Sequence, residues 1–208
     1  MRSTEARRPL QERGQRRVEA ILDAAAEMVA ERGIAGVTMH GIATRSGATI
    51  GSMYHFFPDQ VSVLDALAAR HQASLRALLE RLGHTRWSAL STREAVDRFV
   101  DPLFDYNESH PDLLSVIRYV RERGTECCDA QIERLMLELA ERVVAECQPR
   151  ATAAERAARG ATMLAVIDGV AERTSQVPTP PHRTMIRELK RVLVAYLESG
   201  ARDGARRR

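Results

Sequence analysis

The chain has 208 residues, of which 44% are hydrophobic and 28% charged, and its formal net charge is +3. These values are typical of a folded globular protein with a sizeable core and exclude an intrinsically disordered chain. No apolar run approaches the roughly 18 residues of a membrane span, and the N-terminus lacks the apolar segment of a secretory signal, so we expect a cytoplasmic protein without a membrane partner.

The first predicted segment is a basic, flexible arm over residues 1–14. Residues 1–17 hold six arginines against two glutamates. Basic terminal arms often bind nucleic acid. A second basic tail is predicted over residues 201–208, and for this one a solvated end explains the charge equally well.

Apolar periodicity predicts helices almost throughout, and strand alternation is nearly absent, so the expected fold class is all-α. The first helix covers residues 15–32 and ends at Gly33. Thr38 can cap a short second helix up to residue 45, and Thr49 can cap a third up to about residue 56. The remaining predicted helices cover residues 58–83, 92–108, 111–123, 126–148, 153–175 and 182–199.

A tight turn at residues 46–48, containing Gly47, separates the second and third helices. This layout is typical of a helix-turn-helix, whose second helix braces the unit while the third lies in the DNA major groove. We therefore predict a helix-turn-helix DNA-binding domain over residues 15–57. A helical ligand-binding and dimerisation domain is predicted over residues 58–200.

The third predicted helix divides into two faces. The side chains expected to pack on the first helix are Ile50, Met53 and Phe57, and those expected to face DNA are Thr49, Ser52, Tyr54 and His55. A glycine inside a helix costs about 1 kcal/mol relative to alanine, and close approach to a phosphate backbone is a reason to keep Gly51. The alternative is that the aromatic cluster of residues 54–57 is simply core, and for Phe56 and Phe57 we prefer it.

A longer set of residues carries a family resemblance. In order and spacing it comprises Ile21-Leu22-Asp23-Ala24-Ala25, Arg32-Gly33, Val37-Thr38, Ile42-Ala43, Ser46-Gly47-Ala48, Gly51-Ser52-Met53-Tyr54, Phe56-Phe57 and Leu64. Over about residues 15–65 the chain resembles the DNA-binding domain of the tetracycline-repressor (TetR) family. The resemblance implies a homodimeric, ligand-released transcriptional repressor of a palindromic operator. It also implies that Thr38 caps the second helix and touches phosphate. The full predicted DNA-binding set is Thr38, Ala48, Thr49, Gly51, Ser52, Tyr54, His55 and Gln60.

Gln60 departs from the family pattern, which usually has a lysine at this position. A glutamine can still donate a neutral hydrogen bond, but it gains little from counterion release. The arginine-rich segment before Val18 can compensate by reaching phosphates or the minor groove. The glutamine at residue 60 also leaves open a further alternative, a repurposed dimer that no longer binds DNA specifically.

The last two predicted helices suggest a dimer interface. The apolar stripe of the final helix is wider than one core contact needs, and the helix before it offers small residues. Two such helices from each subunit would form a four-helix bundle with two-fold symmetry, although a monomer could bury both stripes internally. The predicted interface residues are Ala161, Leu164, Ala165, Asp168, Ile186, Leu189, Leu193 and Leu197.

The middle helices are expected to line an effector pocket, for a mainly aliphatic or amphipathic ligand because aromatic content is only 4%. Most of these side chains can equally be plain core. The predicted lining residues are Phe99, Leu103, Phe104, Tyr106, Asn107, Ile117, Arg118, Ile132, Met136, Met163 and Ile167.

No catalytic residue, metal site or cofactor is expected. Nucleophile elbows, phosphate-cradling loops and metal-binding histidine motifs are absent from the sequence, and the six histidines are scattered. His71, on an inner helix face, is more readily a core or pocket histidine than a catalyst. Cys127, Cys128 and Cys147 are interpreted as buried or half-buried thiols rather than a redox sensor. The main alternative to a ligand-responsive regulator is an architectural DNA-binding protein without a ligand.

Overall fold

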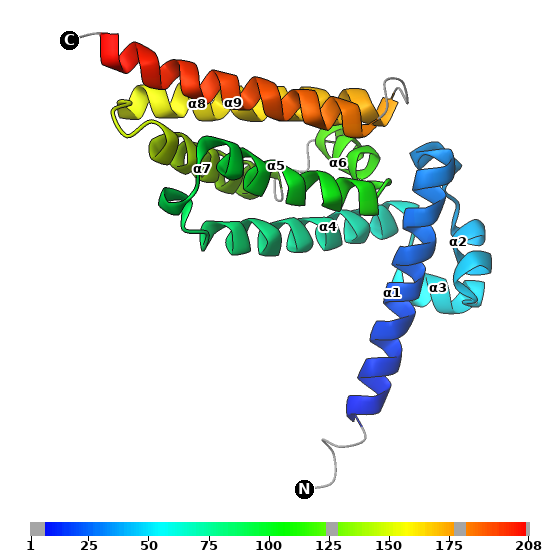
Figure 1. The fold of residues 1–208 in the computed structure, drawn as a ribbon. Coiled ribbons are helices and arrows are strands. Elements are labelled where there is room, and N and C mark those ends of the chain that lie inside the picture. The colour runs from blue at the N-terminus through cyan, green and yellow to red at the C-terminus, as the bar shows by residue number, and fades with distance from the viewer. Residues whose placement is uncertain (1–6, 124–128, 177–181, 207–208) are drawn as a thin grey trace, which may run out of the picture. The chain divides into compact units, whose positions relative to one another are not determined.

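The structure, a computed structural model, describes residues 7–123, 129–176 and 182–206 (Figure 1). Every regular element in these ranges is helical, so the all-α prediction is confirmed. In chain order the elements are α1 (Arg7–Arg32), η1 (Ile34–Gly36), α2 (Met39–Ser46), α3 (Ile50–Phe56), α4 (Gln60–Gly83), η2 (Trp87–Ala89), α5 (Thr92–Ser109), α6 (Leu113–Glu122), α7 (Asp129–Cys147), α8 (Ala153–Gln176) and α9 (His182–Arg206).

The ends of the chain differ from the prediction. The arm expected over residues 1–14 is helical from Arg7 onward, and the tail expected over residues 201–208 is helical up to Arg206. Pro9 lies in the first turn of α1, where its missing N–H is not needed, and the residues around it are good helix formers. In α9, the alanines and arginines around Gly200 offset its weak helix propensity.

Cys127, Cys128 and residues 177–181 lie outside the described residues.

The chain forms two compact units. The first comprises residues 1–71 and 110–125, and the second residues 72–109 and 126–208. The boundary differs from the predicted one at residue 57, because α4 belongs to the first unit up to His71 and α6 belongs there entirely. The reason is packing, since Val116 and Val120 of α6 are buried in the same core as residues of α1.

In the first unit, α2 and α3 lie beside α1, whose N-terminal end runs on beyond them (Figure 1). The fully buried side chains at the centre of its core are Ile21, Ala25, Ile42, Met53, Val63, Leu64, Leu67 and Val116, each 0% exposed. Short helices such as α2 and α3 are marginal alone, so this shared core is what stabilises them.

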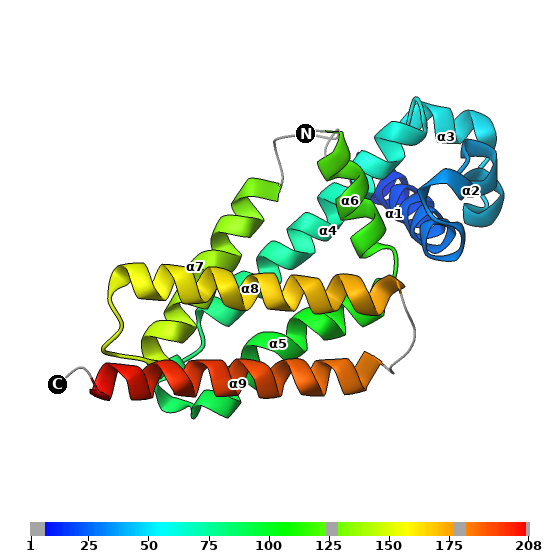
Figure 2. The same ribbon diagram turned by 90° about the horizontal axis from the view of Figure 1, so that it is seen from above.

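In the second unit, α5, α7, α8 and α9 pack around a core that includes Phe99, Ala140, Val143, Met163 and Leu193. Helices α8 and α9 run side by side (Figures 1 and 2). Gly160 lets α8 approach α7 closely, because a Cβ there would lie 3.1 Å from the backbone nitrogen of Glu141. In the described residues, no helix is long and apolar enough to cross a membrane.

Candidate nucleic-acid interface

The turn between α2 and α3 has the geometry that the sequence predicts. Gly47 ends α2 with φ 68° and ψ 14°, the left-handed conformation that glycine adopts without a Cβ clash. The Thr38 hydroxyl oxygen accepts a hydrogen bond from the Gly41 N–H at 3.0 Å and caps α2. The Thr49 hydroxyl oxygen accepts from the Ser52 N–H at 3.2 Å and caps α3. Each cap stabilises a short helix by about 1 kcal/mol.

Helix α3 has one buried and one exposed face. Met53 is 0% and Phe57 7% exposed, whereas Tyr54 is 52% exposed. At about 100° per residue, Gly51 and His55 lie opposite the buried face. A Cβ on Gly51 would have nothing within 4 Å, so this point of the helix surface is open.

The prediction for Ile50 was wrong. It was expected to pack on the first helix, but its side chain is 41% exposed. Ile50 begins α3, and it lies about 40° around the helix axis from Tyr54 at i+4. The same geometry places it about 60° from the buried Met53, so it is the exposure of Ile50 that shows its side chain at the surface.

The other predicted DNA-binding residues divide as well. Thr38, Thr49 and His55 are exposed, and Ser52 is half-buried. The half-buried Ala48 packs against the core, so its side chain does not join the exposed face. The Gln60 side chain is half-buried, and its amide donates to the Ile34 carbonyl at 3.4 Å.

The structure adds Arg17, which sequence reasoning named only as part of a basic segment. Its guanidinium donates a hydrogen bond to the Ser52 hydroxyl oxygen at 3.2 Å and so joins α1 to α3. The side chain is exposed, as are those of Arg13 and Arg16. The signal in the sequence was the arginine spacing of three and four residues, which places Arg13 and Arg17 on one side of a helix.

Two other arginines brace the unit. Arg45 of α2 pairs with Glu31 of α1 at 2.7 Å, and Arg70 of α4 pairs with Asp23 of α1 at 2.6 Å. The hydrogen bond from Arg45 lowers the pKa of Glu31, and the same contact raises the pKa of Arg45. Both arginines are therefore neutralised locally, and the basic character beside α3 comes from α1.

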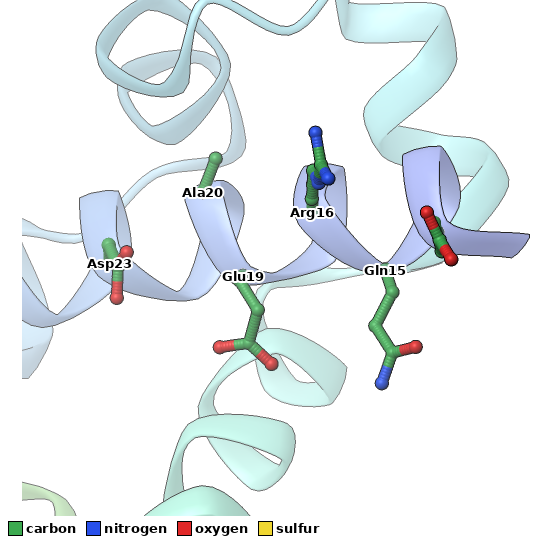
Figure 3. A pocket seen from close by; sticks show the side chains of 6 residues that line it. Gln15, Arg16, Glu19, Ala20 and Asp23 are labelled. Carbon is green, nitrogen blue, oxygen red and sulfur yellow. The ribbon is translucent and has the colours of Figure 1, made fainter. Parts of the chain in front are cut away.

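A surface hollow of about 410 Å³ lies along α1 (Figure 3). Figure 3 shows Gln15 and Glu19 extending to one side of the helix and Arg16 to the other. Its lining residues are Glu12, Gln15, Arg16, Glu19, Ala20 and Asp23. None of the predicted effector-binding residues lines this hollow.

A buried polar pair joins α4 to the start of α6. His71 Nε2 lies 2.7 Å from Asp112 Oδ2, with side-chain exposures of 2% and 3%. The His71 ring also packs edge-on against that of His110, with centroids 5.5 Å apart. His71 is buried, as expected of a core or pocket histidine, whereas its partner Asp112 was not identified from the sequence.

The predicted effector-binding residues are split between the two units. Ile117 and Arg118 lie on α6 in the first unit, and the other nine lie in the second. Of these nine, Phe99, Phe104, Met163 and Ile167 belong to the core of the second unit. Leu103, Tyr106, Ile132 and Met136 are partly buried against that core, and Asn107 is half-buried.

The predicted interface residues of α8 stay a prediction, and those of α9 require a correction. Ala161, Ala165 and Asp168 are exposed and share one face of α8 with Leu164, while Gly160, Met163 and Ile167 face inward. On α9, Leu189, Leu193 and Leu197 are 0–2% exposed within the chain's own core, so they are not available at the surface. Ile186 is half-buried, and Val192, which belongs to the predicted apolar stripe but not to the predicted interface set, is 55% exposed.

Cys147 is half-buried, and burial raises the pKa of its thiol. Over the described ranges, no group of three or more histidine, cysteine, aspartate or glutamate side chains could hold a metal ion.

Two family models match the chain. One, described as "Bacterial regulatory proteins, tetR family", matches residues 21–67. The other, described as "Tetracyclin repressor-like, C-terminal domain", matches residues 91–197, which is more than half of the chain. No curated protein sequence matches it.

Solved structures share the fold. A TetR transcription regulator from Haloarcula marismortui has a TM-score of 0.66 at 14% identity, over 88% of this chain and 97% of its own. A TetR-like transcriptional regulator from Rhodococcus has a TM-score of 0.65 at 17% identity, over 88% of this chain and 94% of its own. The fatty acid degradation regulator FadR from Bacillus halodurans has a TM-score of 0.64 at 16% identity, over 85% of this chain and 94% of its own. At these identities the likeness concerns the fold.

Proposed function

Because this chain belongs to the TetR family of bacterial transcription regulators, we propose that it is a ligand-responsive repressor. In this proposal it binds a palindromic operator as a homodimer and is released by a small, mainly apolar or amphipathic effector. Proteins of this family are regulators and not enzymes. The observation that carries the proposal is the exposed face of α3, beside a turn and two capped helices that fix its orientation.

Phosphate contacts position the reading helix. Thr38 and Tyr54 each expose a hydroxyl, and His55 exposes an imidazole; all three can donate a hydrogen bond to a phosphate oxygen. The open surface at Gly51 allows the α3 backbone to approach the DNA. Arg13, Arg16 and Arg17 on α1 supply positive charge, and each phosphate that such a group neutralises steepens the salt dependence of binding.

We propose that a second copy of the chain covers the outer faces of α8 and α9. Ala161, Leu164, Ala165 and Asp168 supply the α8 side, and the exposed Val192 supplies the α9 side. The small side chains permit close helix approach, and the two-fold symmetry of such a bundle matches a palindromic operator.

The proposed effector site lies among the candidates of the second unit, such as Phe104, Tyr106, Asn107 and Met136. Helix α4 belongs to both units, so a ligand that shifts its second half also moves the part that packs on α1. The ligand must bind the released state more tightly by a few kcal/mol to shift the population. The fold shared with a fatty acid degradation regulator makes a saturated fatty acid a useful first probe.

The test is to incubate the purified chain with fragmented genomic DNA from its source organism at physiological salt and to sequence what it retains. We expect one shared palindrome upstream of a few genes. Weak retention of all fragments, with a steep salt dependence, would favour the architectural alternative. Retention of nothing by a folded, ligand-stripped dimer would contradict DNA reading altogether.

A further inference from the structure

Ile50 is an exposed apolar side chain on the proposed DNA-reading surface, and no role has yet been given to it. It is one of four large hydrophobic residues that the described part of the chain leaves exposed. Two of the four, Ile50 and Tyr54, sit one helical turn apart on α3. Met53 and Phe57 are buried in the core of the first unit, whereas Ile50 is not among the side chains that pack in it or against it.

The chemistry of an aliphatic side chain restricts what Ile50 can recognise. It has no donor or acceptor and cannot bind a phosphate oxygen or the polar edge of a base. In the major groove the apolar feature of a base pair is the C5-methyl group of thymine. The leading residues of a recognition helix are those that reach base edges, and Ile50 is the first residue of α3.

The polar neighbours of Ile50 are already engaged. The Thr49 hydroxyl oxygen accepts from the Ser52 N–H, and the Ser52 hydroxyl oxygen accepts from Arg17. These contacts hold the first turn of α3 in place without using the Ile50 side chain. Resting on the proposed function, we infer that Ile50 is a specificity-determining residue that contacts a thymine methyl group in each operator half-site.

The experiment uses the operator recovered with the full-length chain. Each thymine of one half-site, with its symmetry mate, is replaced in turn by deoxyuridine, which lacks only the methyl group. Dissociation constants are measured at one fixed salt concentration. We expect one position at which the replacement weakens binding about fourfold per half-site, the effect of one buried methylene-sized group.

Two variants assign the effect. In Ile50→Ala, the thymine and deoxyuridine operators should bind equally at that position, because the contact is gone. Tyr54→Phe is the matched control on the same edge of α3, and it should weaken both operators while keeping their ratio. Circular dichroism checks that both variants keep the wild-type helix content.

The outcomes separate this inference from the proposed function. If the wild type binds its palindrome but is indifferent to every deoxyuridine replacement, the inference is overturned and the proposed function stands. If Ile50→Ala keeps the wild-type ratio, another residue reads the methyl group and the inference again fails. If the wild type selects no sequence at all, the proposed function fails and the inference with it.

Discussion

The side chain of Gln60 makes a hydrogen bond inside the protein, at a position where a lysine would contact phosphate. Its amide donates to the Ile34 carbonyl of η1, so part of its hydrogen-bonding capacity is used within the first unit. A lysine at this position has a longer reach and a full positive charge. The positive charge of a lysine at residue 60 would mainly change the affinity for DNA and the salt dependence of binding.

We predict that Gln60→Lys tightens DNA binding without changing the preferred sequence. The logarithm of the binding constant should fall more steeply with the logarithm of salt concentration, by about 0.9 for each added phosphate contact. A salt titration of operator binding measures both effects, with Gln60→Met as the uncharged control. Unchanged affinity and slope would contradict a phosphate contact at residue 60.

Local signals made much of the first unit predictable. The caps Thr38 and Thr49 and the turn at Gly47 depend on neighbouring residues, so their roles follow from spacing. The exposure of Ile50 was not predictable in the same way. It depends on where the core of the unit ends, and helical periodicity alone does not define that limit.

At the level of elements, α3 combines a weak helix-forming residue with an open surface. A Cβ on Gly51 would meet nothing within 4 Å in the described part of the chain, so the folded protein does not require glycine there. Stability of the free protein therefore favours alanine at this position. In our proposal, the approach of DNA opposes it.

We predict opposite effects of Gly51→Ala on stability and on binding. The free energy of unfolding should rise by about 0.5–1 kcal/mol, the difference in helix propensity, while operator affinity falls. Urea unfolding and an operator titration measure the two quantities. Equal or higher operator affinity in Gly51→Ala would argue against close backbone approach.

The pair of His71 and Asp112 ties α4 to the start of α6. Because both side chains are buried, removing one removes a hydrogen bond that water does not replace. The surface pair of Asp65 and Arg123 joins the same two helices at 3.3 Å, but both its side chains are well exposed. The two pairs offer a direct comparison of buried and solvated contacts.

We predict that Asp112→Ala destabilises the protein by about 1–3 kcal/mol and that Asp65→Ala changes stability by less than about 1 kcal/mol. Chemical denaturation followed by circular dichroism gives the two values. Amide exchange over residues 113–122 should accelerate in Asp112→Ala alone. Equal effects of the two substitutions would show that burial of the histidine pair adds nothing.

The sequence predicted the extent of α6 but not its partner helices. The helix expected over residues 111–123 is observed over Leu113–Glu122. Its apolar stripe is compatible with any core, and only contacts distant in sequence assign Val116 and Val120 to the core around α1. The same limit applies to α9, where periodicity identified an apolar stripe but not which of its sides faces the chain's own core.

At the level of the whole molecule, the outer faces of α8 and α9 carry the proposed dimer. Val192 lies at the centre of the exposed apolar edge of α9, with the half-buried Met185 and Tyr196 nearby on the helix surface. An apolar side chain that is 55% exposed in the single chain can be covered by a second copy. A charge at this position would then have to be buried or would prevent association.

We predict that Val192→Arg converts the dimer to a monomer while the protein stays folded. Operator affinity should fall with it, because two linked reading helices gain from effective concentration. Sedimentation equilibrium and an operator titration measure these effects. Glu198→Arg, six residues further along α9 and about 120° around its axis from Val192, should remain dimeric. A dimeric Val192→Arg variant would place the interface elsewhere.

The division of the chain at His71 also bears on the construction of hybrid regulators. A DNA-binding fragment that ends at residue 57 would lack five residues of its own core. These are Val63, Leu64 and Leu67 of α4 and Val116 and Val120 of α6. Such a fragment would expose the apolar surface that these side chains cover. A chimera that exchanges DNA specificity should therefore transplant residues 1–71 together with residues 110–125, two pieces that are separate in the gene but one body in the fold.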